Sequence, residues 1–357
     1  MMGVKTLKND LMVRFAGGLM MAAMAAAAMA QPAVESVPAQ KPQPAQQQPA
    51  QQQQQPTQQQ QQPAQQQQQE STSGQGQDNI PVIVVRVPEV NQIFTVTDRK
   101  GHFVTGLRQE DFGLLDDKKP PVKVNRFSQQ TNLPLRVGVM LDTSSSIRQR
   151  FQFEQDSAVE FFLQVLHQND RAFVEGFDIQ TDIEQDYTNS VDKLSEGIHK
   201  LRPGGGTALF DALYKTCRDQ MLTLQEKNNV RKALIIVSDG DDNYSRALET
   251  DAIKMCQRAE TIVYAISTNV SPSKDKGDDI LQQIADATGG RAFYPTKIED
   301  VAQGFRSIEE ELRSQYSLLY TPADYKQDGS FRTIYLQARD PRYRVRARKG
   351  YFAPKAP

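Results

Sequence analysis

Short apolar runs alternate with helical stretches through the middle of the chain, from about residue 135 to residue 320. The strands that we predict are the apolar runs 137–141, 172–177, 183–187, 233–237, 262–266 and 292–294. The run at 137–141 is almost unbroken, which is typical of a parallel strand covered on both faces. The alternation predicts an α/β fold with a doubly wound, mostly parallel Rossmann-like sheet. If the strand order is 3-2-1-4-5-6, the first and fourth strands are neighbours.

Two segments that flank this region show another pattern, in which short strands alternate with turns. The strands that we predict there are 82–87, 93–97, 102–105, 112–115 and 122–127 before it, and 316–320, 333–337 and 344–348 after it. Neither segment buries enough apolar surface to be stable alone. We therefore expect segments 79–130 and 316–357 to pair into one antiparallel β-sandwich-like domain, with the α/β domain of residues 131–315 inserted between them.

Three arginines alternate along the last predicted strand, at Arg344, Arg346 and Arg348. Side chains two residues apart lie on the same face of a strand. We interpret this face as solvated in preference to an anion-binding strip.

The first 30 residues are typical of an export signal. Basic residues precede an Ala- and Met-rich apolar stretch, and residues 28–30 (Ala-Met-Ala) fit a cleavage site. We expect the mature chain to begin at Gln31, to keep no stable membrane span, and to be periplasmic or secreted; an uncleaved N-terminal anchor is the alternative.

Residues 31–78 are Gln runs broken by Pro and Ala, too polar to form a core, so we predict a disordered linker.

The charge balance excludes some partners. The chain has 42 basic and 43 acidic residues, a formal net charge of −1. This balance gives no overall attraction to nucleic acid or to an anionic membrane. The two cysteines and three histidines show no zinc-type spacing.

Polar loops follow two of the predicted strands, and a third polar loop precedes a helix. The carboxyl ends of parallel strands meet at one edge of a sheet, so Asp142 and Asp239 are expected to face each other there. Three glycines at 204–206 deliver Thr207 beside them. Oxygen donors of this kind suit a hard divalent cation, and the ligands that we predict are Asp142, Ser144, Ser146, Thr207 and Asp239. A phosphate-binding loop would need a lysine after the glycines, and an EF-hand would need a closing glutamate; both are missing.

This set of residues resembles the metal-ion-dependent adhesion site (MIDAS) of von Willebrand factor A (VWFA) domains. More closely, the chain resembles the bacterial exported "VWFA-related" family named from acidobacterial examples, from about residue 82 to 353. Matching stretches are Val96–Gly101, Leu107 with Asp111 and Phe112, and Arg346–Phe352. The resemblance implies Mg²⁺ at the site, with Mn²⁺ and Ca²⁺ as alternatives, and an open coordination position for an acidic group.

The leading functional hypothesis is an exported adhesion or protein-binding module, which grips an Asp or Glu carboxylate of a partner protein through Mg²⁺. We expect no enzymatic activity, because no convincing base or nucleophile accompanies the site. A structural cell-envelope scaffold is one alternative. A metal-dependent hydrolase with Asp241 or Asp242 as base is a weaker one. The sequence does not indicate an oligomeric state.

Cys217 and Cys256 fall on apolar faces of the helices before and after the fourth strand. Right-handed connections place these two helices on one face of the sheet. A disulfide is one alternative in an oxidising compartment, and two buried free thiols, which we slightly prefer, are the other.

Overall fold

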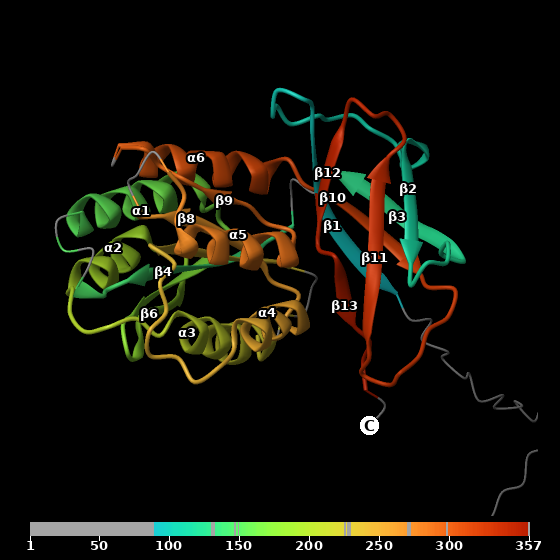
Figure 1. Cartoon of the computed structure of the whole chain (residues 1–357). Helices are drawn as coiled ribbons and strands as arrows, with labels where there is room; N and C mark the ends of the chain where they lie inside the picture. Colours follow the sequence, from blue (N-terminus) through green and yellow to red (C-terminus); the bar gives the residue numbers. More distant parts are fainter. Residues whose placement is uncertain are drawn as a thin grey trace, which may run out of the picture. The chain divides into compact units, whose positions relative to one another are not determined.

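The computed structural model describes residues 89–129, 133–145, 148, 150–224, 226, 230–269, 273–297 and 299–355 (Figure 1). All of them belong to one compact unit, which spans residues 80–357. The expected export signal, the Gln-rich linker and the strand at 82–87 lie outside the described residues, as does Ser146.

A sheet of six strands forms the centre of the α/β domain, in the order β6-β5-β4-β7-β8-β9. Its strands are β4 (Leu135–Asp142), β5 (Arg171–Phe177), β6 (Thr181–Thr188), β7 (Arg231–Ser238), β8 (Ile262–Ser267) and β9 (Ala292–Phe293). Only the β5–β6 pair is antiparallel among these described strands. The doubly wound, mostly parallel fold is therefore confirmed, and so is the neighbouring position of the first and fourth strands.

Helices cover both faces of this sheet. Helices α1 (Phe151–Val165), α2 (Val191–Lys200) and α6 (Asp300–Arg313) pack on one face, and α3 (Leu209–Thr216), π-helix η3 (Cys217–Leu222), α4 (Glu249–Arg258) and α5 (Lys276–Thr288) pack on the other (Figure 1). Strand β4 alternates between the two cores and is buried at every position. An apolar strand with two covered faces is what the unbroken run at 137–141 indicates.

The flanking segments form a second domain of two antiparallel sheets, which we call the β domain. Its strands are β1 (Val90–Thr97), β2 (Phe112–Asp116), β3 (Lys123–Gln129), β10 (Tyr316–Thr321), β11 (Phe331–Ala338), β12 (Arg344–Ala347) and β13 (Gly350–Phe352), with a short helix η1 (Gln109–Asp111) before β2. The sheets have the orders β12-β1-β10-β3 and β13-β11-β2, so both mix N- and C-terminal strands. The expected pairing of the two segments is confirmed.

Two details of the β domain differ from the predicted strands. Residues 102–105 form no strand; Phe103 makes only an isolated bridge to Thr97. Strand β13 was not predicted, and it exists because Phe331, Arg332 and Thr333 of β11 offer it a partner. The pairing of β13 with β11 depends on residues about 20 positions apart, which local patterns do not carry.

The expectation of a solvated arginine face is wrong for two of the three residues. Arg346 pairs with Glu311 of α6 at 2.9 Å, and Arg348 is 9% exposed and pairs with Glu260 at 3.0 Å. Arg344 is exposed. The two ion pairs join the β domain to the α/β domain, so this strand face covers a neighbouring surface and is only partly in solvent.

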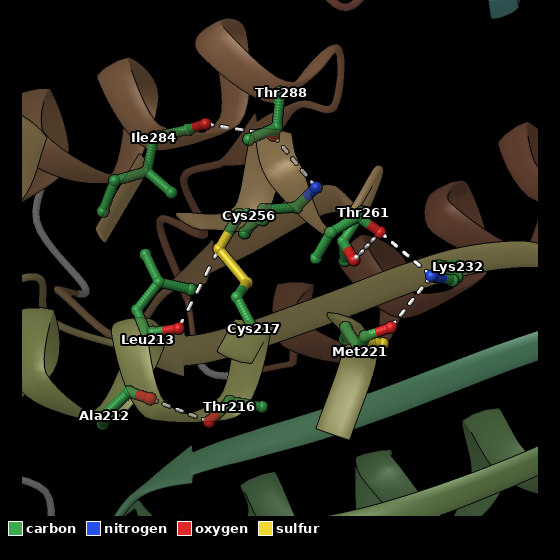
Figure 2. Close-up of a disulfide and its surroundings, with 12 residues drawn as sticks. Ala212, Leu213, Thr216, Cys217, Met221, Lys232, Cys256, Thr261, Ile284 and Thr288 are labelled. Carbon is green, nitrogen blue, oxygen red and sulfur yellow. Dashed lines mark hydrogen bonds between the residues drawn. A yellow bond between two sulfur atoms is a disulfide. The ribbon is translucent and has the colours of Figure 1, made fainter. Parts of the chain in front are cut away.

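A disulfide joins Cys217 to Cys256, so the slight preference for free thiols is wrong. The two Cα atoms lie 4.9 Å apart, and the bond connects the start of η3 to α4 over the same sheet face (Figure 2). Cys256 also lies beside the carbonyl of Leu213. Periodicity placed both cysteines on apolar faces, but only the packing of the two helices brings the sulfur atoms together.

Removing this disulfide is expected to destabilise the protein by roughly 4 kcal/mol, because the bond closes a loop with a sequence separation of 39 and loop closure restricts the unfolded chain. The measurement is urea unfolding of the Cys217→Ala/Cys256→Ala double variant. Reduced wild-type protein is the control and should lose a similar amount. Two titratable thiols in unreduced, denatured protein would show that the bond does not form.

A buried charge cluster holds the two halves of the β domain together. Asp116 of β2 accepts hydrogen bonds from the hydroxyls of Tyr320 and Tyr351 at 2.8 and 2.9 Å. Its other oxygen accepts from Arg332 at 2.9 Å. Asp116 and Arg332 are 1% and 2% exposed, so Asp116 is the buried partner of the Arg332 charge. The half-exposed Asp117 carboxylate lies further from the guanidinium, at 3.6 Å.

The Asp116→Ala variant is therefore expected to lose about 3 kcal/mol of unfolding free energy, because Arg332 would lose its buried partner and keep only the more exposed Asp117 carboxylate at 3.6 Å. Urea unfolding followed by circular dichroism measures the loss. The matched control is Asp324→Ala, which removes a carboxylate from an exposed pair with Lys119 and should change little. Equal losses in the two variants would contradict the role assigned to Asp116.

Candidate metal centre

The first predicted ligand, Asp142, is the last residue of β4 and is completely buried. One carboxylate oxygen accepts the backbone N–H of Ser144 at 2.8 Å, which turns the chain sharply after the strand. The other accepts the hydroxyl of Ser238, the last residue of β7, at 2.6 Å. The carboxylate therefore binds the ends of two neighbouring strands to each other.

The glycine-rich loop, residues 203–207, packs against the first loop, which follows β4. Gly204 donates its N–H to the carbonyl of Thr143 at 2.6 Å, and Ser145 donates to the carbonyl of Gly205 at 3.3 Å. Gly205 has a φ of 75°, a left-handed conformation that favours glycine. A Cβ on Gly206 would lie 2.2 Å from the ring of Tyr244. These glycines thus permit an approach between loops that larger residues would block.

The third loop, after β7, closes on Thr207. Asn243 accepts the N–H of Thr207 through its side-chain oxygen at 3.0 Å and donates its own N–H to the Thr207 carbonyl at 3.0 Å. Asp239 accepts the N–H of Asp241 at 3.2 Å and is half-buried. Direct hydrogen bonds therefore connect the first loop to the second and the second to the third.

The structure brings together the three loops that carry the predicted ligands. Ser144 and Thr207 are each 3% exposed. Ser146 lies outside the described residues. Within the described part of the chain, no group of three or more His, Cys, Asp and Glu side chains could hold a metal, so a cation here would depend on hydroxyl ligands. Cation binding by the five residues stays a prediction.

Burial dominates the electrostatics of these loops. It raises the pKa of Asp142 to about 6, with the charge of Asp239 adding to the effect and the hydrogen bonds from Ser238 and Ser144 opposing it. A buried carboxylate next to a second carboxylate is unstable as an anion pair. A cation between them would remove this penalty.

Sequence reasoning missed a third acidic group, Glu154 of α1. It is 1% exposed, and neither of its carboxyl oxygens has a hydrogen-bond partner among the described residues. Burial raises its pKa to about 8; Arg150 opposes the shift, and the charges of Asp142 and Asp239 increase it. The sequence pattern that could have identified it is its spacing from Phe151 and Ala158, with which it lies on the buried face of α1. An acidic residue on such a face is unusual.

Ser238 and Asn243 were also missed as functional contributors. Neither belongs to the predicted ligand set, yet Ser238 holds Asp142 and Asn243 holds Thr207 in position. Such supporting contacts fix the orientation of ligand side chains. A serine directly after a buried strand was the only sequence signal for Ser238.

The donor set fits a small, hard cation. Every predicted ligand supplies oxygen, and the carboxylate count is low enough that a divalent ion would keep water in its coordination sphere. The buried hydroxyl residues Ser144 and Thr207 lie on loops that are bonded to each other through backbone groups, so their positions are set without a cation.

Residues 137–308 match the family model described as von Willebrand factor type A domain. The match confirms the A-domain resemblance for this segment, while membership of the acidobacterial-type family stays a prediction. No curated protein matches the chain.

Solved structures of low sequence identity resemble the chain. One is von Willebrand factor type A from Catenulispora acidiphila, 13% identical, covering 69% of this chain and 74% of that one with a TM-score of 0.44. Another is the vWF domain of the type V pili tip protein Mfa5 from Porphyromonas gingivalis, 15% identical, covering 50% and 94% with a TM-score of 0.42. The PilB minor pilin from Streptococcus sanguinis is 16% identical, and the alignment covers 52% of this chain and only 62% of the pilin, with a TM-score of 0.41.

Among the helices of the described residues, none has the length and apolar character required to cross a membrane.

With chelator present, so that no metal is bound, the Glu154→Gln variant is expected to be more stable than the wild type. The difference in unfolding free energy should increase as the pH rises from about 4.5 to about 8. Over this range the unfolded wild-type chain ionises Glu154 while the folded protein keeps it protonated, so wild-type stability falls with pH. The difference should grow by up to about 1.4 kcal/mol per pH unit. Urea unfolding near both ends of the range measures it.

The control for this prediction is Glu160→Gln, which neutralises an exposed carboxylate of the same helix. It should leave the pH dependence of unfolding unchanged. If Glu154→Gln also has the wild-type pH dependence, the buried carboxyl group is not protonated as described.

Proposed function

We propose that the protein is an exported binding module whose three-loop site holds Mg²⁺ and uses it to grip an acidic group of a partner protein. One observation carries this proposal: the buried Asp142 carboxylate links the ends of two neighbouring strands, with the buried Thr207 loop bonded beside them. The family match over residues 137–308 supports it, because A-type domains are commonly protein-binding modules.

Each predicted ligand has a role in this proposal. Ser144, Ser146 and Thr207 would be neutral ligands, and Asp142 and Asp239 would bind directly or through water. When bound, Mg²⁺ supplies a positive centre with room for a further oxygen ligand. The residues of the chain fix the hydroxyls and carboxylates in advance, so little entropy is lost when a partner arrives.

The charges around the site favour occupation by a cation. Burial is the main reason that the pKa of Glu154 rises to about 8, and the charges of Asp142 and Asp239 add to the shift. A divalent ion would offset this mutual repulsion, which is a gain in addition to direct coordination. An incoming carboxylate would in turn restore the charge balance of the ion.

The hydrolase alternative has less support than binding. Asp242 accepts the N–H groups of Phe210 and Ser245 with its two oxygens, at 3.0 and 3.1 Å. A carboxylate used in this way caps a helix and a turn. Asp241 is exposed, although partial burial and the charges of Asp239 and Asp275 raise its pKa. Asp242 is therefore committed to structural hydrogen bonds, and Asp241 lies in solvent.

The Thr207→Val variant is expected to lose the stabilisation that Mg²⁺ gives to the wild type, because valine has the shape of threonine without the ligand oxygen. At a hundredfold excess over the dissociation constant, Mg²⁺ should add about 2.7 kcal/mol to wild-type stability. Scanning calorimetry with Mg²⁺ and with chelator measures the shift. Calorimetric titration measures the affinity directly.

The matched control is Thr261→Val, which removes the hydroxyl of a threonine that is 2% exposed just before β8, at the other edge of the sheet. It should keep the full Mg²⁺ response. Absence of any Mg²⁺ response in wild-type protein would reject the proposed site. A wild-type response that Thr207→Val retains would remove Thr207 from the ligand set.

A further inference from the structure

A pocket of about 560 Å³ lies away from the metal centre, where the β domain meets the α/β domain. Its walls are the turn after β1, strand β12 with Lys349, Asp286 near the end of α5, and Arg291 just before β9. Because β9 is parallel to β8, and β8 to β7, Arg291 lies at the edge where these strands begin. The candidate metal centre lies at the edge where β4 and β7 end, so the two sites are distinct.

The pocket is strongly basic. Two acidic residues, Asp98 and Asp286, line it together with six basic ones, which are Arg99, Lys100, Arg291, Arg344, Arg346 and Lys349. The Asp98 carboxylate already accepts the N–H groups of Lys100 and His102, and Asp286 accepts the side-chain amide of Gln282. Since the whole chain has a formal net charge of −1, this concentration of cations is local.

One buried carboxylate, Glu311, pairs with an arginine of the pocket. Glu311 is completely buried and binds Arg346 at 2.9 Å; it also accepts the hydroxyls of Thr95 and Tyr264 at 3.3 and 3.4 Å. Arg291 lies near enough that burial and the charge of Arg346 lower its pKa, while Glu311 opposes the shift. One carboxylate therefore faces two cations, and a negative ligand would relieve their repulsion.

The other cations are available to a ligand. Arg99, Lys100, Arg344 and Lys349 are exposed, and none of them forms an ion pair within the described residues. Arg342 and, to a smaller extent, Arg99 lower the pKa of the Asp340 carboxyl, which is already paired with Arg342 at 2.6 Å. The Arg291 guanidinium lies over the Phe293 ring, 4.7 Å from its centre, a cation–π contact that holds it beside the pocket. A planar guanidinium held in this way presents paired N–H donors that match the oxygens of a phosphate group.

We propose that this pocket binds a compact ligand carrying two or more phosphate groups. Several unpaired cations need more than one negative charge, and each phosphate ester group supplies between one and two at neutral pH. The volume suits a small ligand or a headgroup in preference to an extended polymer. Since the walls come from both domains, a bound phosphate would also fasten the β domain to the α/β domain.

The test uses the full mature chain in chelator, without Mg²⁺, so that the result does not depend on the proposed metal site. Pyrophosphate is titrated into wild-type protein and into the Arg344→Gln/Lys349→Gln variant by calorimetry. We expect saturable binding by the wild type and at least about tenfold weaker binding by the variant, since each lost contact is charge-assisted. Both substituted side chains are exposed, so the fold should persist.

The matched control is Lys193→Gln/Lys200→Gln, which removes two exposed charges from α2 and should bind pyrophosphate as the wild type does. Vesicles that contain cardiolipin, whose headgroup carries two phosphate groups, are compared with vesicles of phosphatidylcholine alone to separate the two sources of phosphate. Sedimentation of the wild type but not the pocket variant with the anionic vesicles indicates a lipid headgroup; pyrophosphate binding alone indicates a free ligand. Lack of saturable pyrophosphate binding, equal weakening in the control, or equally tight binding of citrate would overturn the proposal.

Discussion

The hydrogen bond between Asp142 and Ser238 is the contact on which the candidate site depends. A carboxylate at the end of a fully buried strand has to find donors inside the protein, because water cannot reach it. The neighbouring strand β7 supplies one at 2.6 Å and the following turn supplies another. This requirement ties the start of one loop to the start of the next. The glycine-rich loop then closes the arrangement from the side.

Much of the α/β domain was predictable because its signals are local. Apolar runs gave the six strands to within a few residues, and polar residues directly after two of them indicated the ends where Asp142 and Asp239 lie. The disulfide, the isolated carboxyl group of Glu154 and the ion pairs of Arg346 and Arg348 were not predictable in this way. Each depends on which helix or strand packs against the residue in the fold, and a single sequence does not show which elements pack together.

In the β domain, too, the strands could be predicted from the sequence but some of the contacts between them could not. All of its described strands except β13 were recognisable one by one, and their need for a shared core indicated that the two segments pair. The core confirms this, with Phe94 and Phe112 of the first segment packed against Tyr316 of the second. The charge cluster at Asp116 could not be inferred, since the whole inserted domain separates β2 from β10, β11 and β13 in the sequence.

The way in which the inserted domain is attached has a mechanical consequence. The chain leaves the β domain after β3 and returns at β10, and these strands are antiparallel neighbours in which Gln129 lies opposite Tyr316. A force that pulls on the α/β domain would thus reach the β domain through two covalent connections that lie next to each other. The force would be shared between the adjacent strands β3 and β10. Neither strand would be peeled from the other by such a pull.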